Sequence, residues 1–567
     1  MRTESFLNIF SLFIVLLSIC GFTYLSGNNS TPAAIYPPIH QMLFDPNNIS
    51  TYIFDSGIFN QDLRFSNHPG FQWPKGSGKY AIYTSGFSLA AYIDSMLREA
   101  MASYSGEWAP GYITDSAGVP VARTDFRFKL YKVSRSDNAI NNPDWLNWGL
   151  MVPYGAPFND VDHNGIYNPV IDTPGVRNAS QTIFGCLTDG FLWSHSSGEG
   201  FGGGTLPLYA EMHLTAWGYN TGQLQDVQFL KWEVINKSNK QWNRTYFSVY
   251  SDNDLGFSND DYNGCDTIRQ LGYTYNGDNE DDPNQPYSYG INPPAVGMVL
   301  LESPVNKSVN PPKRLGMSSL IYIKNTSTPG PPCESDPNGE TVGAYNFMRG
   351  LKKDLTPWVI PYTNPPRTTK YCYSGDPENL TGWTEFGGSV QNCGGVLTGN
   401  TIPVNPVGQR RIMLSSGEEN FTISPGERQV FVIAQLIARG TTNVNSVTKL
   451  KLLTDFVRNF YNSVIGVKGI SSNIPAGFIL YQNYPNPFNP STTIKFEIPS
   501  GVKSDKSKVK IVIYDVLGRE VEVLLNEKLS PGTFEVDWDA SNNPSGVYFY
   551  VFSANGFTNT KKMVVLK

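Results

Sequence analysis

Charged residues are scarce in this chain. Only 16% of its 567 residues are Asp, Glu, Lys or Arg, whereas a typical soluble protein has about 25%. The 43 Lys and Arg are outnumbered by 49 Asp and Glu, which gives a net charge of −6. Because binding through phosphate contacts needs a basic surface, we expect no nucleic-acid partner. A coiled coil, which is rich in charged residues, is also excluded.

Histidine and cysteine are few, and the familiar catalytic motifs are absent. There are five His and six Cys, and no two Cys form a C-x-x-C pair, which excludes a zinc ribbon or a thioredoxin-type site. The chain contains no G-x-S-x-G, H-E-x-x-H or Walker A motif. These absences favour a non-catalytic protein. The alternative is an extracellular polysaccharide hydrolase, for which Glu199, Glu211 and Glu233 offer carboxyl groups.

Aromatic and turn-forming residues are plentiful instead. Aromatics reach 13%, with 53 Gly and 40 Pro, which predicts a mainly β fold because aromatics favour strands and Gly and Pro favour turns. We expect several Ig-like β-sandwich units with long loops and a boundary near 200–225. One helix is predicted near 445–461, capped by Asn445-Ser446. Residues 88–102 fit either a helix or a hairpin.

The N-terminal 27 residues have the pattern of a signal peptide. Arg2 precedes a mostly apolar run over residues 6–25, and no basic cluster follows it. A single membrane anchor and a lipoprotein attached through Cys20 are the alternatives. Export permits disulfide bonds, so a disulfide could cross-link the loop-rich segment around residues 333–393. The alternative is that these cysteines are buried free thiols. The cysteines available there are Cys333, Cys372 and Cys393.

The segment DVDHNGIYNPVID, residues 160–172, resembles the first half of a calcium-binding loop. Carboxylate or amide side chains stand at positions 1, 3 and 5, and Gly165 stands at position 6, where the sharp turn needs glycine. Position 12 is Ile171 and not Glu, so this is not an EF-hand. The predicted ligands of a structural Ca²⁺ are Asp160, Asp162, Asn164, the backbone carbonyl of Ile166, and Asp172. A turn without metal is the alternative.

A second acidic segment spans residues 251–267. Its carboxylates are dense enough to repel one another unless they are solvated or bridged by a cation. The candidate ligands for such a cation are Asp252, Asp254, Asp260 and Asp261.

The last 90 residues read as a small β-sandwich that follows a linker at 463–477. Short apolar strands alternate with turns such as Asn555-Gly556. The motifs are YPNPFNP (484–490), YDVLGREV (514–521), PSGVY (544–548) and KKMVVLK (561–567). With them, residues 474–567 closely resemble the type A sorting domain of the type IX secretion system, found in Bacteroidota and their relatives. The positions that carry this resemblance include Tyr484, Pro485, Asn486, Pro487, Phe488, Gly518, Gly546, Lys561 and Lys562.

The resemblance implies that this domain is a signal for export. In that family the domain, here 478–567, is an Ig-like sandwich that is recognised by the secretion machinery at the outer membrane. It is usually cut off and often exchanged for a lipopolysaccharide link. We therefore expect a secreted protein on the outer cell surface, with removal of the domain by a cut within 463–477.

The body, residues 31–462, resembles uncharacterised secreted proteins that carry the same domain. The resembling stretches are TSGF (84–87), APG (109–111), DVDHNGIYNP (160–169), VINKS (234–238), DNDLG (252–256) and GCDT (264–267). This resemblance implies a hairpin that turns near Asp94-Ser95, and it brings no known activity. We expect a binding or structural module with calcium-stabilised loops, whose partner could be a surface polysaccharide.

Overall fold

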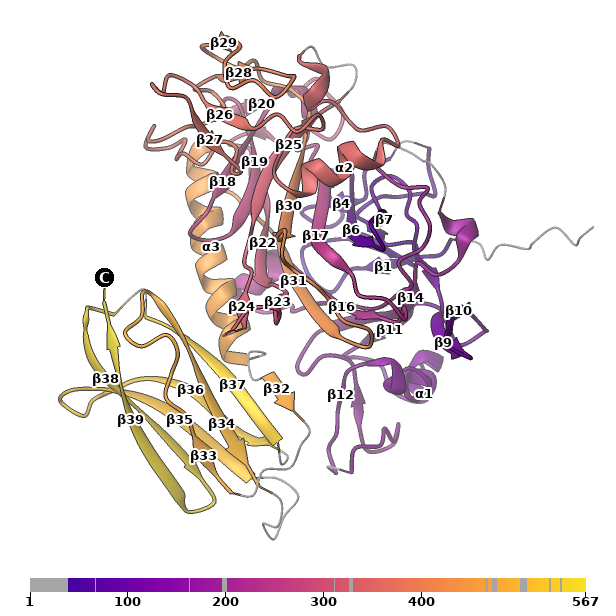
Figure 1. Ribbon diagram of the computed structural model, residues 1–567, viewed down its shortest axis with the longest axis vertical. Helices are drawn as coiled ribbons and strands as arrows, with labels where there is room; N and C mark the ends of the chain where they lie inside the picture. Colours follow the sequence, from indigo (N-terminus) through magenta and orange to yellow (C-terminus); the bar gives the residue numbers. More distant parts are fainter. Residues whose placement is uncertain are drawn as a thin grey trace, which may run out of the picture. The chain divides into compact units, whose positions relative to one another are not determined.

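The computed structural model describes residues 39–66, 68–162, 164–195, 201–310, 312–325, 330–464, 468–471, 477–499, 507–529, 532–540 and 543–566 (Figure 1). The predicted signal peptide and most of the predicted linker lie outside these residues. The described part is mainly β, as expected from the composition.

Two large antiparallel sheets form the body. In the described residues, the first has the order β1–β2–β3–β6–β17–β30–β25, with β7 beside β6, and the second has the order β11–β14–β15–β16–β31–β22–β19–β18, with β8 beside β14. The first sheet comprises β1 (Gln41–Phe44), β2 (Thr51–Phe54), β3 (Ile58–Phe59), β6 (Thr84–Ile93), β7 (Met96–Ala100), β17 (Asn243–Asp252), β25 (Ser319–Lys324) and β30 (Arg410–Gly417). The second comprises β8 (Ala109–Pro110), β11 (Tyr131–Ser134), β14 (Gln181–Thr188), β15 (Ala210–Gly218), β16 (Val227–Asn236), β18 (Asp261–Asp266), β19 (Leu271–Asn276), β22 (Ala295–Glu302) and β31 (Arg428–Ala438).

Short two-stranded hairpins lie outside these two sheets. They are β4 (Phe71–Gln72) with β5 (Tyr80–Ile82), β9 (Tyr112–Ser116) with β10 (Val119–Arg123), β12 (Phe158–Asn159) with β13 (Thr173–Pro174), β20 (Glu280–Asp281) with β21 (Gly290–Ile291), β23 (Val305–Asn306) with β24 (Lys313–Arg314), β26 (Trp358–Ile360) with β27 (Arg367–Thr369), and β28 (Ser389–Gln391) with β29 (Asn400–Ile402).

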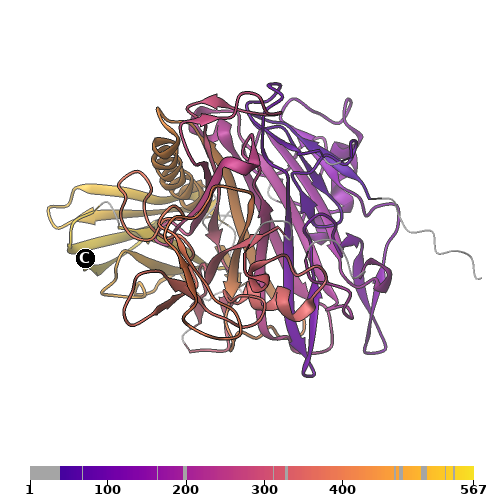
Figure 2. The same cartoon turned by 90° about the horizontal axis from the view of Figure 1, so that it is seen from above.

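The two sheets pack face to face around one apolar core. Phe87 of β6 stacks on Trp232 of β16 with ring centroids 4.8 Å apart, and Phe247 of β17 stacks on Phe431 of β31 at 6.2 Å. All four rings belong to the same buried cluster. Side chains alternate along a strand, so the face of the second sheet that carries Trp232 lines this core and the other face is free to carry a second layer. In Figure 2 the strands of the body, coloured from indigo to orange, run in roughly the same direction.

The body is therefore one sandwich, and the expected division into consecutive units near 200–225 is wrong. β14, which precedes that range, pairs with β15, which lies within it, and β6 pairs with β17. β16 pairs with β31, which follows it by about two hundred residues. Alternating apolar residues specify which face of a strand is buried, but not which strand lies beside it.

The predicted helix is present as α3 (Asn443–Val464), which packs against β31, β22 and β19 (Figure 1). Its apolar stripe, including Val447, Leu450 and Val457, covers the outer face of the second sheet. The predicted cap is misplaced, because the hydroxyl of Thr442 accepts a hydrogen bond from the Asn445 N–H at 3.1 Å. Two short helices that were not predicted, α1 (Pro143–Asn147) and α2 (Thr341–Met348), also occur in the described residues. None of the described helices is long and apolar enough to cross a membrane.

Residues 88–102 form a hairpin, as the body resemblance implied. β6 pairs with β7, and the turn residues Asp94 and Ser95 have φ angles of 47° and 67°. Two successive residues with positive φ are typical of the tight turn that fits the twist of a hairpin. The helical spacing of the apolar residues is thus overridden by pairing within the sheet.

The C-terminal segment forms a separate sandwich of two four-stranded sheets, in the orders β32–β37–β34–β33 and β36–β35–β38–β39. Its strands are β32 (Lys468–Ser471), β33 (Ile479–Leu480), β34 (Ser491–Ile498), β35 (Ser507–Asp515), β36 (Glu520–Leu529), β37 (Gly532–Asp539), β38 (Gly546–Ala554) and β39 (Phe557–Val565). Phe496, Trp538 and Phe552 lie in its own buried core. β32 falls inside the predicted linker, which therefore contributes a strand.

Candidate functional site

The predicted calcium loop is a closed loop between two paired strands. β12 pairs with β13, which holds the two ends of residues 160–172 together. The side chains of Asp160, Asp162 and Asp172 each place a carboxylate oxygen within 4.8 Å of the others. Three of the predicted ligands thus converge, and the structure gives no contact that tests the role of the Ile166 carbonyl.

The conformation of the loop follows from its Asp, Asn and Gly residues. Gly165 has a φ of +76° and donates its N–H to the Asp160 carboxylate at 2.9 Å. The Asn164 side-chain oxygen accepts the Ile166 N–H at 2.7 Å. Asp172 is buried and accepts the N–H groups of Val161 and Asn168 at 2.8 and 2.7 Å. These bonds fix the side chains that carry hard oxygen atoms, the kind of ligand that Ca²⁺ takes.

The second acidic segment is buried, so it is not a solvated loop. Asp252 and Asp261 are each 2% exposed, and Asp252 pairs with Arg411 at 3.3 Å. Burial, reinforced by neighbouring carboxylates, raises the pKa of Asp254 to about 8 and that of Asp260 to about 6. Among the described residues, no three carboxylates of this segment converge as those of 160–172 do. Arg411 therefore offsets part of the negative charge of this segment.

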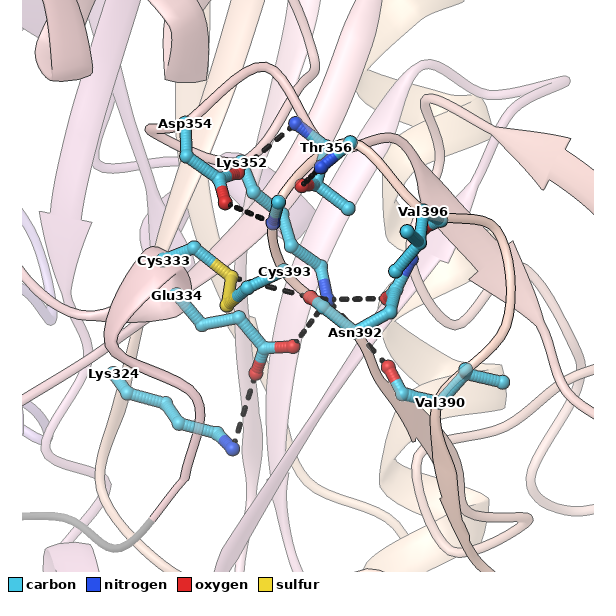
Figure 3. The surroundings of a disulfide bond; sticks show 12 residues. Lys324, Cys333, Glu334, Lys352, Asp354, Thr356, Val390, Asn392, Cys393 and Val396 are labelled. Atoms are coloured by element: carbon cyan, nitrogen blue, oxygen red, sulfur yellow. Dashed lines mark hydrogen bonds and ion pairs between the residues drawn. A yellow bond between two sulfur atoms is a disulfide. The ribbon is translucent and has the colours of Figure 1, made fainter.

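Two of the three candidate cysteines are bonded. Cys333 and Cys393 form a disulfide that spans 60 residues, and Cys372 is a buried free thiol (Figure 3). A buried ionic network joins the same two segments. Lys352 Nζ lies 2.6 Å from Glu334 Oε1 and donates to the side-chain and main-chain oxygens of Asn392 at 2.8 and 2.9 Å. The disulfide and this network hold parts of the loop-rich segment to one another, and Lys324 of β25, 3.1 Å from Glu334, ties them to the first sheet.

A buried group of ionisable residues was not foreseen from the sequence. The His195 ring lies 3.6 Å from Glu107 and 3.6 Å from Asp189, and Glu99 lies nearby. Burial raises the pKa of Glu107 to about 7, although His195 opposes the shift, and burial raises the pKa of Glu99 well above its usual value. The side chains of His195 and Asp189 have no exposed surface. Two members of the group are thus enclosed within the packing of the body.

A second group contains Cys186, Glu211, His213 and Glu233; the two glutamates were candidate carboxyl groups in the sequence, but their meeting with Cys186 and His213 was not foreseen. The His213 ring is 3.2 Å from Glu211 and 3.8 Å from Glu233. Burial disfavours the charged form of Glu211, but the bond to His213, the Ile113 N–H and nearby Lys237 together lower its pKa. No motif predicts either group, because their members are brought together only by strand pairing. Glu199 lies outside the described residues.

The sorting motif lies along the final strand of the C-terminal sandwich. Phe488 is buried against Trp538 with ring centroids 5.6 Å apart. Its backbone bonds to Val564 and Leu566, and Asn486 accepts the Val564 N–H at 2.9 Å. β39 is an edge strand, so the motif covers the end of an edge that would otherwise be open to other strands.

The remaining motif residues occupy turns or the surface. Gly518 has a φ of +77° in the turn between β35 and β36, and Gly546 begins β38. Tyr484 is 64% exposed, and Lys561 and Lys562 lie on β39. These groups remain available for recognition.

A family match identifies the C-terminal segment. Residues 482–566 match the model of the secretion system C-terminal sorting domain. No curated protein matches the chain. A solved polysaccharide lyase is similar over 63% of this chain and 34% of its own length, with 8% identity and a TM-score of 0.17, too low to support any argument. Residues 482–566 are therefore a C-terminal sorting domain of the type IX secretion system, which marks this chain as a protein secreted to the cell exterior.

Proposed function

We propose that the body is a non-catalytic binding or structural module of the cell exterior, stabilised by a Ca²⁺ ion in the 160–172 loop. The observation that carries the proposal is the convergence of Asp160, Asp162 and Asp172 within 4.8 Å. Three carboxylates this close repel one another unless protons or a cation offset their charge. Extracellular sites of this kind bind Ca²⁺ with dissociation constants of about 10⁻⁴–10⁻³ M, which suits a secreted protein.

The ion would stiffen the layer formed by this loop and α1, which covers part of the outer face of the second sheet. The loop is already tied to α1, because Trp145 Nε1 donates to the Pro169 carbonyl at 3.0 Å and the Tyr167 hydroxyl donates to the Trp145 carbonyl at 2.7 Å. Asn164 and the Ile166 carbonyl would complete the ligand set, together with water. A loop that is already rigid loses less conformational entropy when it binds a partner.

A surface polysaccharide is the partner we propose. Sugars stack on exposed aromatic rings, and Phe65 and Tyr287, whose rings both contact the His68 ring, are 58% and 37% exposed. The hydrolase alternative needs two carboxyl groups in an accessible cleft. Of the candidate glutamates within the described residues, Glu211 is 3% exposed and the side chain of Glu233 is 18% exposed, which favours binding over catalysis.

Calorimetry and thermal melting with Ca²⁺ test the calcium site. At a concentration ten times the dissociation constant, binding stabilises the folded chain by about 1.4 kcal/mol. Asp162→Ala should abolish both the heat of binding and the rise in melting temperature. The matched control is Asp278→Ala, which removes an exposed carboxylate from another loop and should leave both unchanged. Absence of Ca²⁺ binding by the natural chain, with no effect of Asp162→Ala on melting, would refute the site.

A glycan array probed with the full chain tests the polysaccharide partner. Binding should weaken in Tyr287→Ala and persist in Tyr362→Ala, which removes a ring that is 69% exposed elsewhere on the body. Equal loss in both variants, or no glycan bound at all, would count against this partner.

A further inference from the structure

A thiol, an imidazole and a carboxylate converge on the outer face of the second sheet. β14 pairs with β15 so that Cys186 lies directly opposite His213, and Glu211 lies two residues along β15 on the same face. Met212 and Leu214, the residues that alternate with them, point into the core between the sheets. The sulfur, one ring nitrogen and one carboxylate oxygen lie within 4.8 Å of one another. We propose that these three residues bind a divalent transition-metal ion of the zinc class.

The donor set matches the chemistry of that ion. Zn²⁺ takes Cys sulfur, His nitrogen and Glu oxygen at about 2.0–2.3 Å in tetrahedral sites, which places neighbouring ligand atoms about 3.3–3.8 Å apart. The Nε2 atom of His213 lies 3.2 Å from Glu211 Oε1, close to that spacing. The paired strands fix the backbone, so small side-chain movements suffice. A soft sulfur donor also distinguishes this site from the all-oxygen loop at 160–172.

Neighbouring residues could orient the proposed ligands, as the groups behind metal ligands usually do. Glu233 lies directly opposite His213 on β16, and its carboxylate is 3.8 Å from Nδ1. Nδ1 is buried and makes no hydrogen bond in the described structure. A carboxylate behind the second ring nitrogen fixes the tautomer that leaves Nε2 free to bind metal. The Ile113 N–H donates to Glu211 Oε2 at 3.1 Å, which orients the carboxylate and leaves Oε1 for the ion.

Binding would replace two existing contacts. The Cys186 thiol donates to the Gly111 carbonyl at 3.3 Å; when the ion binds, the thiol releases its proton to solvent and the sulfur bonds to the metal instead. Lys237 Nζ lies 3.5 Å from Glu211 Oε1 and is 35% exposed, so it can turn toward solvent. Gly155 borders the ring, where a Cβ atom would lie 2.7 Å from Nδ1. A side chain at residue 155 would therefore crowd the imidazole.

Titration of the full chain with Co²⁺, after metal removal with a chelator, tests the site. Co²⁺ occupies zinc sites and gives a thiolate-to-metal charge-transfer band when cysteine sulfur binds it. We expect one equivalent of Co²⁺ to produce this band and Zn²⁺ to displace it. Cys186→Ala should lose the band, and Glu233→Gln should keep it with about 10–100-fold weaker affinity. Cys265→Ala, which removes another buried free thiol, should behave like the natural chain.

Three results would overturn the proposal: no band in the natural chain, a band that survives in Cys186→Ala, or a band that disappears in Cys265→Ala. Each would mean that the three side chains are only a hydrogen-bonded part of the packing. Circular dichroism of metal-free Cys186→Ala checks that it folds; if it does not, the natural chain and Glu233→Gln decide the matter. Asp162→Ala should retain the band, which separates this result from the calcium test.

Discussion

Replacing Lys352 with methionine should destabilise the body strongly, because its ammonium group is fully buried. Methionine keeps most of the aliphatic stem but removes the charge that lies 5.0 Å from the Trp358 ring. The change leaves Glu334 without its 2.6 Å partner and leaves two oxygens of Asn392 without a donor (Figure 3).

The magnitude follows from which partners remain. Breaking a buried ion pair by removing one member costs about 3–5 kcal/mol. Glu334 keeps a second cation, Lys324, at 3.1 Å and a hydrogen bond from the Tyr322 hydroxyl at 2.8 Å. We therefore expect the lower end of that range, about 3 kcal/mol. In a chain that already carries Glu334→Gln, Lys352→Met should cost less free energy of unfolding than it does in the natural chain, because the two substitutions act on one interaction.

Urea unfolding of the full chain, with the disulfide intact, measures the effect. The matched control is Lys313→Met, since Lys313 pairs with Glu418 at 2.9 Å but its side chain is 59% exposed. An exposed pair contributes at most about 1 kcal/mol. If Lys352→Met costs no more than Lys313→Met, then the buried network does not stabilise this segment and the reasoning fails.

Three other predictions follow from the structure. Replacing Cys333 and Cys393 with serine opens a 60-residue loop and should cost about 4 kcal/mol in urea unfolding; a cost below about 1 kcal/mol would contradict it. The pKa of Glu107 rises from 4.5 to about 7 through burial, so stability should fall as pH rises from about 4.5 to 7. Glu107→Gln should remove up to about 3 kcal/mol of that fall, and equal pH profiles would refute this. Deleting 474–567 should keep the body inside the cell in a fractionation assay; unchanged secretion would overturn the assignment.

Features that depend on short stretches of chain were predictable from the sequence. The turn at Asn555-Gly556 has positive φ at both residues, as its composition predicts. α3 lies where the apolar spacing places a helix, although its cap is at Thr442. The sorting motif and the acidic loop at 160–172 are also contiguous in sequence, so both could be found from residue types and spacing; calcium binding by the loop stays a prediction. Neither feature needed knowledge of a distant partner.

Several candidate residues could be placed only with the tertiary structure. The three cysteines at 333–393 allowed more than one pairing, and the fold selected Cys333 with Cys393. The acidic residues near 252–261 looked solvated or metal-bound, yet the fold buries Asp252 and Asp261 and gives Asp252 an arginine partner. Burial of this kind depends on what covers a loop, which local composition does not specify.

The sequence by itself thus determined a mainly β chain, its export address, one long helix and the loop where three carboxylates meet. The tertiary structure decided that the body is one sandwich and that Cys186, His213 and Glu211 share one point on its sheet. The physical reason is the range of the interactions involved. Turns and periodic apolar faces arise between near neighbours, whereas strand order and register arise from packing between segments that can be hundreds of residues apart.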